Sequence, residues 1–141
     1  MPDYDFSQLS AFDFEMLVHG LLKKEWGRSF EGCSLEAFKS GRDRGIDLRY
    51  CCPRFGSKTI IQCKHYVRSP FSKLLSHLKN EEAPKVSALA PDRYVLVTSL
   101  GLTPDNKDAI RKVFDPFIKS TGDIIGQTEV NQLLDLTHPL N

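Results

Sequence analysis

Hydrophobic positions recur with two different periods along the chain, and these periods divide it into expected helices and strands. An amphipathic helix of about four turns is expected near the N-terminus, where apolar side chains recur at helical spacing, at Phe14, Leu17, Val18, Leu21 and Leu22. Ser10 precedes this run in a capping position. The helix is expected to end near residues 26–27.

Short β-type runs occupy the middle of the sequence. Residues 32–38 read as a first strand, and residues 43–50 and 59–64 flank a turn at residues 53–57 that contains proline and glycine. This pattern predicts a β-hairpin. Residues 93–99 are nearly continuously apolar, which is typical of a strand covered on both faces.

Further helical segments follow the hairpin. A helix beginning at Ser69 or Ser72 carries Leu74, Leu75 and Leu78, and Pro84 is expected to break or kink it. Another helix begins at residues 103–105, a short extended piece covers residues 123–126, and a last helix covers residues 128–135. The order α-β-β-β-α-β-α predicts an α/β fold with a central mixed β-sheet flanked by helices.

The hairpin collects polar side chains on one face. Successive side chains of a strand alternate between faces, so Gln62 and Lys64 share a face opposite Ile61 and Cys63. Asp47 lies on the polar face of the other strand. If the two polar faces coincide, a carboxylate, an amide oxygen and an ammonium group meet at a sheet edge.

This trio suits a hard divalent cation, which takes oxygen ligands and one or two carboxylates. Asp47 supplies charge, Gln62 supplies a neutral carbonyl oxygen, and the backbone carbonyl of Cys63 lies between them. Lys64 is placed to orient the attacking water or to neutralise developing negative charge. The alternative is structural: Asp47 caps a turn and Lys64 is a solvated strand lysine.

These residues resemble a known group of nucleases. The run Asp-Arg-Gly-Ile-Asp at residues 43–47, followed by Gln62-Cys63-Lys64, resembles the Mrr-like restriction endonuclease branch of the PD-(D/E)xK superfamily, in which glutamine replaces an acidic residue. The resemblance covers nearly the whole chain, from Glu15 on the first helix to residues 95–99. It implies a restriction-endonuclease-like core and a metal-dependent DNA endonuclease.

The resemblance also assigns the site. Asp47, Gln62, Lys64 and Glu15 are implied as catalytic residues. Mg²⁺ or Mn²⁺ is implied as the cofactor, with Asp47, Glu15, Gln62 and the Cys63 carbonyl as ligands. Glu15 lies about 90° from the centre of the apolar face of its helix, at the border of core and solvent. Without the resemblance it reads as a solvated helix glutamate.

Composition sets broad limits. The 141 residues match one domain, with 40% hydrophobic and 26% charged residues and a net charge of +1. This balance excludes a strongly polybasic protein but allows a locally basic groove for double-stranded DNA. Cations cluster around the hairpin, at Arg42, Arg44, Arg49, Arg54, Lys58, Lys64 and Arg68. The cluster favours a phosphate-facing surface over an ordinary solvated one.

The sequence shows no apolar leader and no run long enough to span a membrane, so a cytoplasmic location is expected. Its four cysteines then remain free thiols. Cys51 and Cys52 lack the spacing of a zinc or redox pair. No Cys–His–acid arrangement supports a cysteine nucleophile.

The main alternative to a nuclease is a catalytically inactive module of the same fold that binds nucleic acid. Residues 1–141 are expected to form a single nuclease domain, and the sequence after the last helix leaves open whether it is a fragment of a longer chain. The resemblance also implies bacterial restriction or anti-phage defence and a fused or associated STAND-type NTPase sensor. The oligomeric state is left open between a monomer and a homo-oligomer.

Overall fold

A computed structural model describes residues 6–27, 34–37, 47–52, 57–66 and 69–137. For the first two strands it describes the backbone. The helical elements are η1 (Phe6–Gln8), α1 (Ala11–Gly27), α2 (Phe71–His77), η2 (Leu78–Glu82), α3 (Ala83–Leu89), α4 (Pro104–Val113), η3 (Thr121–Asp123) and α5 (Gln127–Thr137). The strands are β1 (Ser34–Ala37), β2 (Asp47–Cys52), β3 (Ser57–Lys64), β4 (Arg93–Thr98) and β5 (Ile124–Ile125).

In the described part of the chain the strands form one five-stranded sheet, ordered β1-β2-β3-β4-β5. The pairs β1–β2 and β2–β3 are antiparallel, whereas β3–β4 and β4–β5 are parallel. The predicted hairpin and mixed sheet are therefore confirmed. Short strand β5 adds a last parallel edge.

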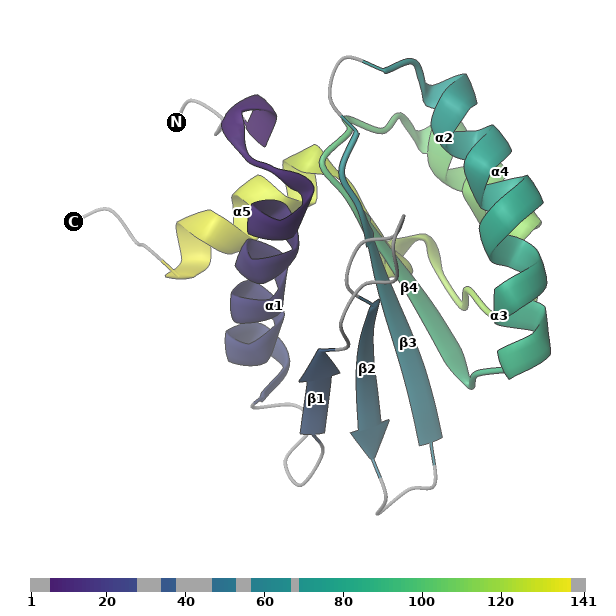
Figure 1. The fold of residues 1–141 in the computed structure, drawn as a ribbon, viewed down its shortest axis with the longest axis horizontal. Coiled ribbons are helices and arrows are strands. Elements are labelled where there is room, and N and C mark those ends of the chain that lie inside the picture. Colours follow the sequence, from purple (N-terminus) through teal and green to yellow (C-terminus); the bar gives the residue numbers. More distant parts are fainter. Residues whose placement is uncertain (1–5, 28–33, 38–46, 53–56, 67–68, 138–141) are drawn as a thin grey trace.

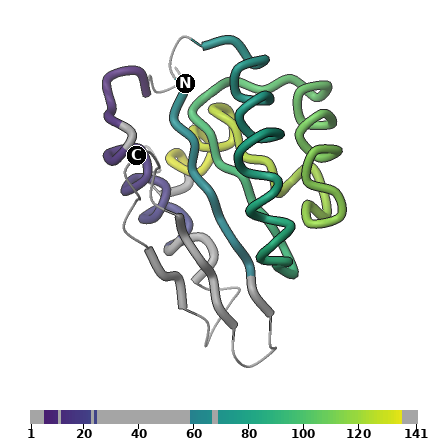
Figure 2. The backbone as a smooth tube through the Cα atoms, turned by 45° about the vertical axis from the view of Figure 1, so that its right-hand side comes forward, coloured from purple at the N-terminus to yellow at the C-terminus, as the bar shows by residue number. Residues whose placement is uncertain are grey.

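Helices cover both faces of the sheet (Figure 1). On one face α1 and α5 pack against Ile61 and Cys63, which lie two residues apart on β3 and therefore share that face. On the other face α2, α3 and α4 pack against Ile60 and its neighbours on β4. Figure 2 shows from a second direction that α2 and α4 lie side by side on this face. Buried strand β4 is covered on both faces, as its apolar run predicts.

Local capping fixes the starts of two helices. The Ser10 hydroxyl accepts a hydrogen bond from the backbone N–H of Asp13 at 3.0 Å, as expected for an N-cap. Helix α4 begins with a capping box between Thr103 and Asn106, and Pro104 occupies its first turn. Both starts match the sequence prediction.

The segment around Pro84 differs from the prediction. Elements α2, η2 and α3 follow one another from residue 71 to residue 89 without a break, and η2 is a π-helix. The backbone N–H of Ala83 donates to the carbonyl of Leu78, five residues earlier. A proline inside an α-helix clashes with the carbonyl four residues before it, and the wider π turn accommodates Pro84 without a break.

Candidate active site

The side chains of Gln62 and Lys64 meet a buried carboxylate from the helical layer. Gln62 Nε2 donates to Glu82 Oε1 at 2.8 Å, and Lys64 Nζ donates to Glu82 Oε2 at 2.6 Å. Glu82 is the last residue of the π-helix η2 and is 0% exposed. The predicted shared face of Gln62 and Lys64 is therefore confirmed, but it is a buried polar cluster under α2 and α3.

Tyr94 fixes the orientation of the Gln62 amide. Its hydroxyl donates to Gln62 Oε1, while the amide nitrogen of Gln62 faces Glu82. A carboxylate only accepts hydrogen bonds, so this orientation is the one that satisfies both neighbours. The ring of Tyr94 stacks on Phe114 with centroids 4.4 Å apart, which anchors the hydroxyl from the core.

His77 and Lys85 form the outer side of this cluster. His77 Nε2 lies 3.0 Å from Glu82 Oε2, and Lys85 Nζ lies 4.0 Å from Glu82 Oε1. Their side chains are 28% and 46% exposed, against 10% for Lys64. Solvent therefore screens Lys85 strongly and Lys64 weakly, so the Lys64–Glu82 pair dominates the local electrostatics.

The neighbours of Glu82 keep it ionised. Burial raises its pKa, but the hydrogen bond and positive charge of Lys64, together with the hydrogen bond from Gln62, outweigh burial and hold the pKa below 4.5. The same carboxylate acts on Tyr66, whose pKa is raised by burial and then by the negative charge of Glu82. Glu82 thus stays ionised inside the domain, and the ammonium of Lys64 balances its charge.

This lowered pKa predicts a pH dependence of stability. A carboxylate with a depressed folded-state pKa stabilises the fold fully above its unfolded pKa, near 4.5 for Glu82, and loses that contribution as the pH falls through its folded pKa. We expect Glu82→Gln to lack this acid-dependent part and to lose about 3–5 kcal/mol at neutral pH, because Lys64 stays buried without its counter-charge.

Denaturant unfolding from about pH 7 down to about pH 3 measures both effects. Glu81→Gln is the matched control, since Glu81 is the exposed neighbour of Glu82. A Glu82→Gln protein as stable as wild type at every pH would show that the pair contributes nothing to folding.

The register brings Asp47 to the same place on the sheet. Asp47 pairs directly with Gln62 across the β2–β3 ladder, and β3 continues to Lys64 beyond this pair. Directly opposed residues of an antiparallel pair lie on one face of the sheet. By register, Asp47 therefore belongs to the face that carries Gln62 and Glu82. The loop residues Asp43 and Gly45 lie outside the described residues.

Glu15 lies on the other helical layer. Its side chain is 3% exposed on α1, deeper than the border position expected from the helical wheel. Its chain neighbour Phe14 packs with Ile61 and Cys63 on the opposite face of the sheet from Gln62. The role of Glu15 as a metal ligand stays a prediction.

Glu82 was missed by the sequence reasoning, although a signal for it exists. It follows Leu74, Leu75 and Leu78 at spacings of eight, seven and four residues, and Val86 continues the row. A charged residue on the apolar stripe of a helix is expected to be buried with a partner. The predicted break at Pro84 hid this periodicity.

His65 is a packed histidine. Its Nε2 lies 2.7 Å from the carbonyl oxygen of Leu9, and its Nδ1 lies 2.7 Å from Ser99 Oγ. The ring stacks on Phe14 with centroids 5.1 Å apart. Nε2 therefore joins the end of β3 to the N-terminal segment, and Nδ1 joins it to Ser99, just after β4.

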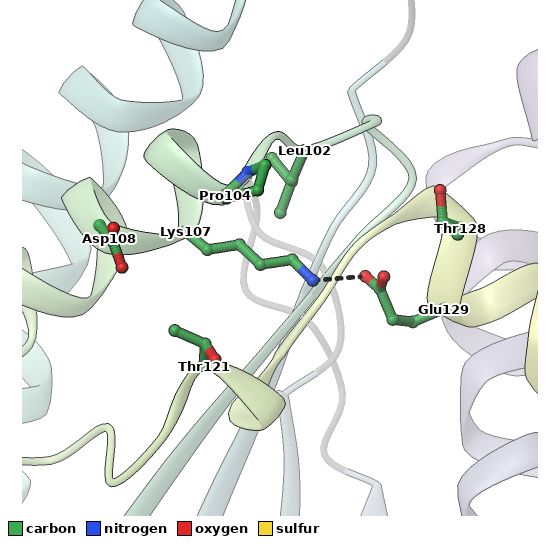
Figure 3. Close-up of a pocket in the computed structure, with 7 residues that line it drawn as sticks. All are labelled: Leu102, Pro104, Lys107, Asp108, Thr121, Thr128 and Glu129. Carbon is green, nitrogen blue, oxygen red and sulfur yellow. Dashed lines mark ion pairs between the residues drawn. The ribbon is translucent and has the colours of Figure 1, made fainter.

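A pocket of about 500 Å³ lies apart from these residues, between the first turns of α4 and α5 (Figure 3). Lys107 reaches across it towards Glu129, and their charged atoms are 3.2 Å apart. Leu102, Pro104 and Thr128 line its walls. None of the predicted site residues lines this pocket.

The oxygen donors near Gln62 match the chemistry of a hard divalent cation. Glu82 brings a carboxylate against Gln62, and Asp47 is the residue that pairs with Gln62 across the β2–β3 ladder. An amide oxygen has two lone pairs, so Tyr94 and a cation can share that of Gln62. Among the side chains that the structure describes, no group of three or more His, Cys, Asp or Glu residues converges on one point. The fit therefore depends on Asp47.

A mixed sheet with helices on both faces, carrying Gln-x-Lys on β3 opposite an aspartate on β2, defines a restriction-endonuclease-like domain. A family model described as "Restriction endonuclease", Mrr_cat, matches residues 6–113, from η1 to the end of α4. The chain belongs to this Mrr-type restriction endonuclease family. The predicted Mrr-like resemblance and fold class are confirmed, and membership makes the chain a nuclease-type domain.

A curated relative matches the chain over a longer span. The chain is 44% identical over 131 residues, 93% of its length, to a Sinorhizobium fredii protein named "Uncharacterized protein y4cD". The match covers 19% of that protein, so the chain spans about a fifth of its length. No solved structure matches the chain. None of the described helices is long and apolar enough to cross a membrane.

Proposed function

We propose that this domain is an endonuclease that hydrolyses phosphodiester bonds of double-stranded DNA with the help of Mg²⁺ or Mn²⁺. The observation that carries the proposal is the register of β2 and β3, which puts Asp47 opposite Gln62 with Lys64 two residues further along β3. Family membership supports the substrate class. Restriction or anti-phage defence in a bacterial cytoplasm is the biological setting that we propose.

Asp47, Gln62 and the Cys63 carbonyl would hold the ion, which would supply Lewis-acid polarisation of the phosphate and a more acidic water. Glu15 stays a predicted further ligand, because α1 packs on the opposite face of the sheet from Gln62. Water attacks phosphorus, one P–O ester bond breaks, and the departing oxygen takes a proton. The ammonium of Lys64 carries three N–H donors, one of which Glu82 accepts. Glu82 compensates part of the ammonium charge, and the two remaining N–H donors would stabilise the negative charge that develops on the phosphate.

Cleavage of an end-labelled DNA duplex tests the proposal. We expect shortened products with Mg²⁺ or Mn²⁺, none with excess EDTA, and restored cleavage when Mg²⁺ is added back. Binding should weaken as salt rises, because most affinity comes from phosphate contacts. A folded protein that binds duplex DNA and never cuts it, with any divalent ion, would contradict the proposal.

A second candidate is an inactive nucleic-acid-binding module, and the Lys64–Glu82 ion pair is the observation that favours it. A lysine held 2.6 Å from a buried carboxylate also suits a purely structural role. The cleavage assay separates the two candidates.

We further propose that an NTPase sensor, fused or associated, controls the domain, and that the domain acts as a homo-oligomer. The greater length of the relative is compatible with a fused sensor.

Replacing Gln62 with glutamate should make the thermal stability of the domain depend on bound Mn²⁺. The new carboxylate would face Glu82 Oε1, where Gln62 now donates at 2.8 Å, so the metal-free variant should unfold at a lower temperature than wild type. Mn²⁺ should bind the variant about tenfold more tightly, because a unit charge about 4 Å from a cation contributes about 1–4 kcal/mol depending on screening.

Thermal unfolding with and without Mn²⁺, and calorimetric titration with Mn²⁺, measure these two effects. Gln132→Glu adds the same charge at an exposed position on α5 and serves as the control. Unchanged Mn²⁺ affinity in folded Gln62→Glu protein would place the ion away from Gln62.

A further inference from the structure

Glu82 joins both polar residues of the Gln-x-Lys strand through one carboxylate. Oε1 accepts from Gln62 at 2.8 Å and Oε2 accepts from Lys64 at 2.6 Å. We propose that Glu82 is a positioning residue of the active site, which fixes the Gln62 amide and the Lys64 ammonium on the face that Asp47 shares by register. This inference rests on the proposed nuclease function.

A merely structural explanation leaves the choice of partners unexplained. A buried ion pair is often no more stabilising than well-packed hydrophobic side chains of similar volume. The domain holds another such pair, in which Arg93 on β4 donates to both oxygens of Asp123 at 3.1, 3.2 and 2.6 Å. The Arg93–Asp123 pair ties β4 to η3. The carboxylate of Glu82 instead contacts two predicted site residues directly, Gln62 and Lys64.

The chemistry of lysine gives such a contact a purpose. A lysine side chain is a point charge on a flexible stem, so by itself it holds its ammonium poorly in place. A misplacement of about 1 Å at a reacting centre can cost about 100-fold in rate. Glu82 restrains the ammonium from one side, and Gln62, held in turn by Tyr94, restrains the carboxylate. The four side chains form one continuous chain of hydrogen bonds.

The backbone conformation around Glu82 also supports a role in the active site. The π turn ends at Glu82, and π turns within α-helices are frequent at functional sites. Its neighbour Glu81 is exposed, whereas Glu82 is 0% exposed. Glu82 therefore faces the sheet at the end of the wider turn, while the preceding Glu81 faces solvent.

The test combines kinetics with a direct observation of Lys64 in the full chain. Wild type, Glu82→Gln, Glu82→Asp and the control Glu81→Gln are compared in single-turnover cleavage of duplex DNA with Mg²⁺ and in DNA binding with Ca²⁺. In parallel, ¹⁵N spectra of lysine side chains report ammonium groups that exchange slowly with water. The Lys64 signal is assigned by its loss in Lys64→Arg.

We expect Glu82→Gln to cut about 100-fold more slowly with DNA affinity changed less than about threefold, and to lose the slowly exchanging Lys64 signal. Glu82→Asp keeps the charge on a side chain shorter by one methylene, so its cleavage rate should lie between those of Glu82→Gln and wild type. Glu81→Gln should match wild type in every measurement.

Wild-type cleavage by folded Glu82→Gln would overturn the inference while leaving the nuclease function in place. If Glu82→Gln does not fold, Glu82→Asp decides: full cleavage by that variant overturns the inference, and slowed cleavage with a displaced Lys64 signal supports it. A wild-type protein that never cuts would overturn the nuclease function and, with it, any positioning role in cleavage.

Discussion

Asp47→Asn is expected to reduce DNA cleavage by at least about 1,000-fold while leaving the domain folded. Removing the negative charge of the residue that pairs with Gln62 should weaken metal binding, and a bound ion contributes several kcal/mol to phosphoryl chemistry. A rise of about 1.4 kcal/mol in the activation free energy lowers the rate tenfold. Asparagine keeps the volume of the side chain, so packing should change little.

Single-turnover cleavage at saturating protein and Mg²⁺ measures this loss, and Mn²⁺ titration should show weaker binding by the variant. Asp108→Asn, at an exposed position on α4, removes the same charge elsewhere and should cut like wild type. Folded Asp47→Asn protein that cuts at the wild-type rate would remove Asp47 from the site.

Lys64→Met is expected to have two separable effects. Glu82 would be left buried without its main counter-charge, so the free energy of unfolding should fall by about 3–5 kcal/mol. Cleavage should also fall by about 100-fold or more, because a fixed positive charge near the reacting phosphate is lost. DNA affinity in Ca²⁺ should change little, since a transition-state contact lowers turnover rather than binding.

The double variant Lys64→Met/Glu82→Gln separates the two effects. Removing both members of a buried pair costs much less than removing one, so the double variant should regain most of the lost stability. It should nevertheless stay as inactive as Lys64→Met. Lys73→Met, at an exposed position on α2, is the control for a lost lysine. A double variant that regains both stability and wild-type cleavage would make Lys64 a structural residue.

The elements and faces of the sheet could be predicted because they follow from local periodicity. Alternation along β3 separated Gln62 and Lys64 from Cys63, and the structure places Cys63 in the α1 layer and the other two against η2. Capping chemistry likewise predicted the starts of α1 and α4. These signals are encoded within a few neighbouring residues.

The surroundings of the site could not be predicted in the same way. Contacts of Glu82 with Gln62 and Lys64 span 20 and 18 residues and depend on how α2 and α3 pack on the sheet. The break or kink expected at Pro84 divided a segment that the structure shows as continuous, so the apolar stripe from Leu74 to Val86 was not followed through Glu82. Lys64 was expected at a sheet edge, but it lies on β3, in the middle of the strand order, and its side chain is 10% exposed.

The most direct measurement is the conversion of supercoiled plasmid DNA, which has no ends, by the purified domain with Mg²⁺. Wild type should give nicked and linear forms, and neither form should appear with EDTA or with Asp47→Asn, while both proteins still bind the plasmid. Cleavage that persists in EDTA, or equal cleavage by wild type and Asp47→Asn, would contradict a metal-dependent endonuclease centred on Asp47, Gln62 and Lys64.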